Sequence, residues 1–168
     1  MFVAEKPEEQ KTWTLYFDGA LNSKGKGVRV ILTSLEGIII PRAYQLAFPA
    51  THNIEEYEAL ISGLRMPILL NVKYLRIIGD SELVIGQNVN KYKAINLKLI
   101  PYHELVIVLL KQFKKATHMH VSRAGNILAD ALANLSSAFN FPINASTETI
   151  IIQKMEEPLI HYHDFLFR

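Results

Sequence analysis

The chain changes character at Trp13-Thr14-Leu15-Tyr16-Phe17, an apolar and aromatic run that leads directly into Asp18-Gly19. Residues of these types in a short run are typical of a β-strand, and Asp-Gly is a common turn dipeptide. We therefore predict a first strand over this run and a turn at Asp18-Gly19. The strand carries an acidic side chain to its carboxyl end, where open α/β sheets bind their ligands.

Four further strands are predicted downstream. Residues 28–33 and 37–46 are rich in β-branched side chains and are separated by a short turn segment. This favours an antiparallel meander with the first strand, and Pro41 predicts an irregular third strand. Residues 74–79 predict a fourth strand that enters Asp80, and residues 118–121 predict a fifth.

Helices are predicted after the third strand and between the later ones. Thr51 and Asn53 open a helix whose apolar side chains recur every three or four residues as far as Ile68. Pro67 predicts an end or a bend of this helix near Arg65. Further helices are predicted over 82–88, 101–115 and 126–139. The alternation indicates a mixed α/β sheet covered by helices.

Length and composition indicate one globular domain. The chain has 168 residues, of which 49% are hydrophobic, and we assign residues 1–11 as a linker, 12–139 as the domain and 140–168 as a C-terminal tail. The tail is interpreted as a linker to a further region or as a strand that docks elsewhere. The start has no basic segment followed by an apolar stretch, and the longest aliphatic run, 105–110, is too short for a membrane helix. We therefore expect a monomeric intracellular protein, cytoplasmic or nuclear, with no secretion and no membrane partner.

Cysteine and net charge limit the chemistry. The chain has no cysteine, which excludes disulfides, a thiol nucleophile and cysteine-ligated metals. Metal chemistry must then use imidazole or oxygen ligands, and oxygen favours hard cations such as magnesium. The formal net charge is only +2, although the isoelectric point of about 8.8 permits binding of nucleic acid.

Four acids stand where a fold of this order can bring them together, namely Asp18, Glu56, Asp80 and Asp130. Each has an ordinary structural explanation, as a turn residue, a helix cap or a solvated polar side chain. Together they indicate a site, because Asp18 and Asp80 end adjacent central strands. Clustered carboxylates repel one another unless they are protonated or neutralised, and a pair of magnesium ions is the natural counter-charge.

Four motifs in order resemble type 1 ribonuclease H. They are Tyr16-Phe17-Asp18-Gly19-Ala20, Thr51-His52-Asn53-Ile54-Glu55-Glu56-Tyr57-Glu58-Ala59-Leu60-Ile61, Gly79-Asp80-Ser81-Glu82-Leu83-Val84, and Arg123-Ala124-Gly125-Asn126-Ile127-Leu128-Ala129-Asp130-Ala131-Leu132-Ala133. The resemblance covers about residues 12–139 and is closest to the ribonuclease H domain of plant long-terminal-repeat retroelement polyproteins and to cellular proteins similar to it. It implies a five-stranded mixed sheet of order 3-2-1-4-5 with helices on both faces. It also implies endonucleolytic hydrolysis of the RNA strand of RNA–DNA hybrids, leaving 5′-phosphate and 3′-hydroxyl ends.

The resemblance also implies the metal ligands and their roles. Asp18 would bridge two Mg²⁺ ions, Asp80 and Glu56 would bind one ion, and Asp130 the other, with Mn²⁺ as a possible substitute. Among the neighbouring acids of the first helix, Glu56 is chosen because it is the acid three residues after Asn53, as in the family pattern.

Substrate contacts and a proton-transfer residue are inferred from the same motifs. The 2′-hydroxyl groups of a hybrid would meet Asn53 and the backbone near Gly19-Ala20. Ser81 and Asn126 are further candidates for substrate binding. Arg123, which precedes the last carboxylate, is assigned to proton transfer or product release in preference to His118 and His120.

Two departures from the family pattern keep alternatives open. His52 stands where an asparagine is common, and Glu82 stands where glutamine is common. One alternative is a catalytically weak or inactive module that binds nucleic acid within a retroelement polyprotein, beside reverse transcriptase or integrase regions. Another is a related nuclease or integrase of the same broad fold that acts on DNA.

Overall fold

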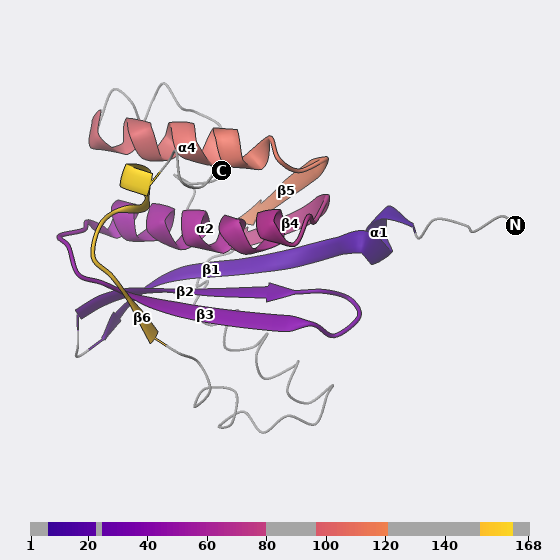
Figure 1. The fold of residues 1–168 in the computed structure, drawn as a ribbon, viewed down its shortest axis with the longest axis horizontal. Helices are drawn as coiled ribbons and strands as arrows, with labels where there is room; N and C mark the ends of the chain where they lie inside the picture. The colour runs from indigo at the N-terminus through magenta and orange to yellow at the C-terminus, as the bar shows by residue number, and fades with distance from the viewer. Residues whose placement is uncertain (1–6, 23–24, 80–96, 121–151, 163–168) are drawn as a thin grey trace, which may run out of the picture.

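A single mixed β-sheet of six strands organises the protein, in the order β5-β4-β1-β2-β3-β6 (Figure 1). The computed structural model describes residues 7–22, 25–79, 97–120 and 152–162. The predicted order 3-2-1-4-5 is confirmed, and β6 is added beside β3. The strands are β1 (Thr12–Asn22), β2 (Gly25–Thr33), β3 (Ile39–Leu46), β4 (Tyr74–Gly79), β5 (Lys115–His120) and β6 (Ile152–Met155).

The first three strands form the predicted antiparallel meander, and β4 and β5 run parallel to β1. The turn predicted at Asp18-Gly19 is wrong, because β1 continues to Asn22 and pairs there with Gly25. Asp18 therefore lies within the strand, opposite Arg29. Pro41 is accommodated because β6 pairs with β3 only from Ala43 onward, so β3 is an edge strand at the proline.

Helix α2 (His52–Leu69) begins as predicted but ends later. The Thr51 side chain caps it by accepting a hydrogen bond from the Ile54 N–H at 3.2 Å. Of the end or bend expected near Arg65, the end is wrong, because Pro67 lies in the last turn and its missing N–H interrupts the hydrogen-bond ladder only near the helix terminus. The Pro67 carbonyl accepts the Val72 N–H at 2.9 Å, which closes this end of the helix.

Helix α4 (Ile100–Leu110) is shorter than predicted. The chain turns after Leu110 so that the N–H groups of Lys114 and Lys115 reach the Lys73 carbonyl at 2.9 and 3.1 Å. Strand β5 consequently starts at Lys115, three residues before the expected position. The remaining elements are α1 (Glu8–Lys11), η1 (Leu97–Leu99) and η2 (Leu159–Tyr162). The helices expected over 82–88 and 126–139 lie outside the described residues.

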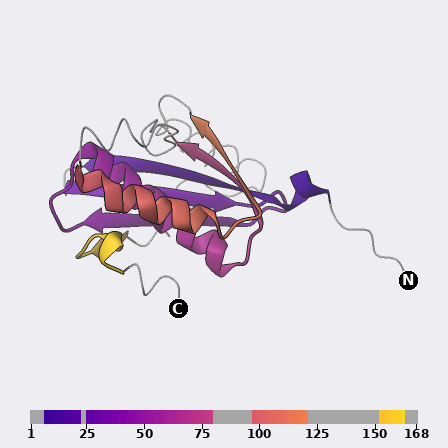
Figure 2. The same ribbon diagram turned by 90° about the horizontal axis from the view of Figure 1, so that it is seen from above.

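The core lies between the sheet and α2, and α4 packs against α2 on the same side (Figure 1, Figure 2). Alternate residues of the central strands, among them Leu15, Phe17 and Val30, are fully buried beneath α2. Gly63 lies close against the sheet, because an added Cβ there would lie 3.0 Å from Leu15 and 3.2 Å from Val30. In the part of the chain that the structure describes, no helix is both long enough and apolar enough to cross a membrane.

Candidate active site

Asp18 is a buried acid in the middle of β1, and its partner is an arginine. Its side chain is 12% exposed, and Oδ2 accepts a hydrogen bond from Nη2 of Arg29 at 2.8 Å. The two residues are direct cross-strand partners, so they project from the same face of the sheet. Arg29 is not among the residues predicted from the sequence. The signal that was available is the hairpin register, which places Arg29 opposite Asp18.

Glu56 lies in the second turn of α2 and is only 2% exposed. The exposed His52 is its neighbour on the helix surface, with Nε2 3.7 Å from Oε1 of Glu56. Nδ1 of the same imidazole lies 3.6 Å from Oε2 of Glu55. The residue that departs from the family pattern is therefore in direct contact with the predicted metal ligand. Asn53, the predicted substrate contact, is exposed in the first turn.

The topology brings Asp18 and Glu56 to the same end of the sheet. Strand β3 runs parallel to β1, since both are antiparallel to β2, so α2 starts at the end toward which β1 runs. Gly63 of α2 lies against Leu15 of β1. Glu56 lies two helical turns before Gly63, about 10 Å nearer the start of α2. Asp18 lies three strand residues onward, also about 10 Å.

The two carboxylates approach this end from different faces. Glu56 lies on the face of α2 that also carries Gly63, toward the sheet. Strand alternation places Asp18 on the face opposite Leu15 and Phe17, beside the point where the pairing of β1 with β4 ends at Tyr16 and Ile78. The donors that this end presents are carboxylate oxygens, which suit a hard cation.

The structure describes only some of the other predicted site residues. Gly19 and Ala20 lie in β1 and pair with Val28 and Gly27. Strand β4 ends at Gly79, so Asp80 follows it directly in the sequence, as predicted. Within residues 7–22, 25–79, 97–120 and 152–162, no group of three or more potential ligands is suited to hold a metal. The predicted site residues outside these ranges are Asp80, Ser81, Arg123, Asn126 and Asp130.

A third acid of α2, Glu58, is fully buried and was not predicted to have a role. Its Oε1 accepts a hydrogen bond from the Tyr102 hydroxyl at 2.8 Å, and both of its oxygens lie 3.2 Å from the Leu159 N–H. Burial raises the pKa of Glu58 to about 7, against the opposing effect of these hydrogen bonds. The carboxylate points toward α4 and η2, away from the site that Glu56 serves.

His118, which the sequence analysis ranked below Arg123, lies in β5 next to Ile77. Its Nε2 is buried and has no hydrogen-bond partner among the described residues. Burial lowers the pKa of this imidazole. This environment is that of a histidine packed into the fold.

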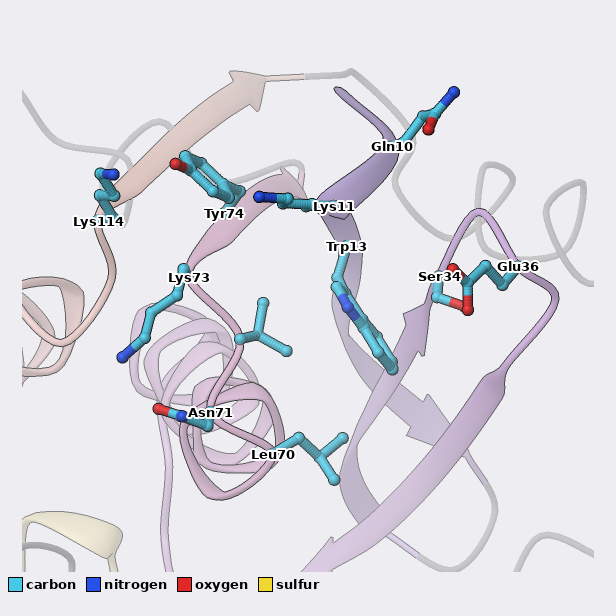
Figure 3. Close-up of a pocket in the computed structure, with 11 residues that line it drawn as sticks. Gln10, Lys11, Trp13, Ser34, Glu36, Leu70, Asn71, Lys73, Tyr74 and Lys114 are labelled. Atoms are coloured by element: carbon cyan, nitrogen blue, oxygen red, sulfur yellow. The ribbon is translucent and has the colours of Figure 1, made fainter. Parts of the chain in front are cut away.

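A pocket of about 440 Å³ lies at the opposite end of the sheet, where β1 and β4 begin and α2 ends (Figure 3). Trp13 is five residues before Asp18 on β1, so these two positions are about 17 Å apart along the strand. Lys114 lies with its Nζ 5.8 Å from the centre of the Tyr74 ring. The lining residues are Gln10, Lys11, Trp13, Ser34, Glu36, Leu70, Asn71, Val72, Lys73, Tyr74 and Lys114. The pocket contains none of the predicted catalytic residues.

Several known proteins are similar to this chain in sequence and in fold. Residues 16–136 match the family model described as reverse transcriptase-like. The protein named Ribonuclease HI of Halobacterium salinarum is 34% identical over 121 residues, which cover 71% of this chain and 61% of that protein. The crystal structure of RNase H1 from the same halophilic archaeon superposes with a TM-score of 0.59 at 31% identity, covering 71% of this chain and 92% of that one.

A second relative is a much longer protein. The bifunctional protein of Mycobacterium tuberculosis is 30% identical over 105 residues, which cover 62% of this chain. The matched part spans only 29% of the length of that mycobacterial protein. The shared region is therefore one domain that occurs in proteins of different size. The expected closeness to plant retroelement polyproteins stays a prediction.

Proposed function

Because the chain belongs to the type 1 ribonuclease H family, we propose that it hydrolyses the RNA strand of RNA–DNA hybrids. The observation that carries the proposal is that two buried carboxylates, Asp18 and Glu56, lie toward the same end of the sheet. They come from the first and second family motifs. The name of the archaeal relative, Ribonuclease HI, supports the same activity.

The proposed cofactor is a pair of Mg²⁺ ions, with Mn²⁺ as a substitute. The buried donors of the site are carboxylate oxygens, the ligand type that these cations prefer. Asp18, Glu56, Asp80 and Asp130 would hold the ions. When bound, the ions would supply the positive charge that favours attack by water at phosphorus and stabilises the leaving 3′-oxygen.

The described residues have defined parts in this proposal. Arg29 fixes one oxygen of Asp18, which restricts the rotation of the carboxylate. Asn53 is exposed one turn before Glu56, where it is placed to meet a 2′-hydroxyl of the hybrid. Gly19, Ala20, Ser81 and Asn126 remain the other proposed substrate contacts. Arg123 remains the residue proposed to assist proton transfer or product release.

His52 favours a second candidate function. Its imidazole lies against the oxygens of Glu55 and Glu56, where family members commonly have an asparagine amide. A module with this change would bind the hybrid and cut it slowly or not at all. Within a polyprotein, reverse transcriptase or integrase regions would then supply the missing affinity for the hybrid or the missing activity.

One assay separates the two functions. The purified chain is incubated with labelled RNA–DNA hybrid, duplex DNA and duplex RNA, each with Mg²⁺, with Mn²⁺ and with a chelator. Metal-dependent cutting of the hybrid alone supports the first function, and Asp18→Asn and Glu56→Gln should each abolish it. Glu55→Gln is the matched control, since it changes the neighbouring buried acid on the same helix. Binding of the hybrid without cutting would establish the second function.

A further inference from the structure

The segment 152–162 lies beyond the family match, which ends at residue 136, and it docks at the same end of the sheet as Asp18 and Glu56. Strand β6 pairs in parallel with Ala43–Leu46 at the end of β3. The N–H of Ala47 then donates to the Met155 carbonyl at 2.9 Å. Figure 1 shows β6 crossing the end of β3, and η2 between α2 and α4.

Glu58 is the second anchor of this segment. Its two carboxylate oxygens accept the N–H of Leu159, the first residue of η2, while the Leu159 side chain is buried in the core. Tyr102 of α4 donates to the same carboxylate. One buried acid thus joins three parts of the chain that are far apart in sequence. Because Glu58 and Leu159 are both buried, the loss of this acceptor leaves the Leu159 N–H without its partner.

The two anchors bracket the start of α2. Ala47 is held before the helix begins, and Glu58 is held in its second turn, two residues after Glu56. The chain between them contains the helix cap, Asn53 and Glu56. The segment therefore restrains the part of the molecule that carries the proposed metal ligand and the proposed substrate contact.

Packing alone does not explain an acid at this position. A buried carboxylate is costly to desolvate, and an apolar residue of similar volume often stabilises a core better. Acidic groups in cores are useful when they specify which partner docks and in which register. Glu58 has such a partner, the backbone of Leu159.

We propose that residues 152–162 form a C-terminal clamp on α2 and that Glu58 is a positioning residue for Glu56. The clamp rests on the proposed function, because Glu56 is positioned for metal-dependent cleavage. The structural part of the proposal, that residues 152–162 restrain residues 47–58, does not depend on that function.

The test compares Glu58→Leu, which removes the acceptor, with Glu58→Gln, which keeps one. Tyr102→Phe is the matched control, because it removes the other hydrogen bond to Glu58 and leaves the Leu159 contact intact. Hydrogen exchange is measured on the full chain. In Glu58→Leu we expect amides of 152–162 and 47–56 to exchange about tenfold faster or more, with protection in β1 and β4 unchanged. Glu58→Gln and Tyr102→Phe should stay close to the parent chain.

The functional readout is the Mg²⁺ concentration that gives half-maximal cleavage. We expect Glu58→Leu to raise it about tenfold and to lower kcat, because Glu56 is displaced. Glu58→Gln should restore both values to within about threefold. A merely structural role would lower the amount of folded protein without changing the Mg²⁺ requirement of the folded fraction.

Two results would overturn the clamp. One is unchanged protection over 47–56 in folded Glu58→Leu, and the other is an unchanged Mg²⁺ requirement in an active variant. If Glu58→Leu does not fold, Leu159→Ala loosens the same segment from its other side and must give the same two changes. If the parent chain does not cleave hybrid at all, the proposed function fails, and the exchange data still decide whether the clamp exists.

Discussion

The ring of Phe17 fills the space in which a side chain on Gly79 would have to lie. Phe17 immediately precedes Asp18 on β1, and Gly79 immediately precedes Asp80 at the end of β4. The two strands are parallel neighbours in the sheet. Only a glycine lets the buried ring pack against the backbone of β4 at the point where both strands deliver their acids.

Gly79→Ala should therefore destabilise the protein by about 1–3 kcal/mol, because the fully buried ring must move to admit a methyl group. Urea unfolding measures the loss. Gly63→Ala is the graded control. Its Cβ would meet flexible ends of Leu15 and Val30 at 3.0–3.2 Å, and up to about 1 kcal/mol of helix propensity offsets the crowding. Equal losses in the two variants would contradict the special role of the Phe17–Gly79 contact.

Arg29 provides a second prediction, at the site itself. Arg29→Gln removes the charged donor that fixes Oδ2 of Asp18, so cleavage of hybrid should fall about tenfold with little change in stability. Arg42→Gln is the matched control, because Arg42 is an exposed arginine on the neighbouring strand that bonds the Pro41 carbonyl. A similar fall in both variants would indicate a general effect of surface charge on nucleic-acid binding.

The burial of His118 predicts that the free energy of unfolding decreases at acid pH. Burial lowers its pKa in the folded state, so the unfolded chain takes up the proton first as the pH falls. The stability that neutral His118 contributes is fully present above the unfolded pKa of about 6.5. It is lost as the pH falls through the lower pKa of His118 in the folded state. His118→Phe should flatten the decline of the unfolding free energy below pH 6.5, as followed by urea titrations at several pH values. His161→Gln changes an exposed histidine and should leave the profile unchanged.

The family resemblance predicted the sheet order, and short-range sequence patterns predicted the strand over residues 74–79 and the start of α2. Thr51 is a short-range cap, and residues 74–79 alternate between partly buried and buried side chains, as in an ordinary strand. The turn at Asp18-Gly19 was predicted wrongly because pairing with β2 overrides the local preference of Asp-Gly. Hydrogen bonds between separate strands determine whether such a segment turns or stays extended, and local sequence patterns do not contain this information.

Among the candidate site residues, Asp18 and Glu56 were predicted from the family motifs, and their partners were not predicted. Arg29 could have been found from the register of the hairpin, once the true length of β1 was known. Glu58 could not be assigned to Leu159, because 101 residues separate the two groups. The family pattern selects Glu56 among the neighbouring acids of α2, but no local pattern reveals which distant backbone group Glu58 will bind.

The cap of α2 supports a last prediction, which links stability to the site. Thr51→Ala removes the acceptor for the Ile54 N–H and should cost about 1 kcal/mol, whereas Thr51→Ser should retain nearly all of it. The first turn of α2 carries Asn53 and leads into Glu56, so fraying there should also lower cleavage of hybrid in the alanine variant. Hydrogen exchange at Ile54 and Glu55, together with the cleavage rate, measures both effects. If Thr51→Ala loses the stability but keeps the full cleavage rate, the position of Glu56 does not depend on the cap, and the anchors at Ala47 and Glu58 suffice to hold the helix start.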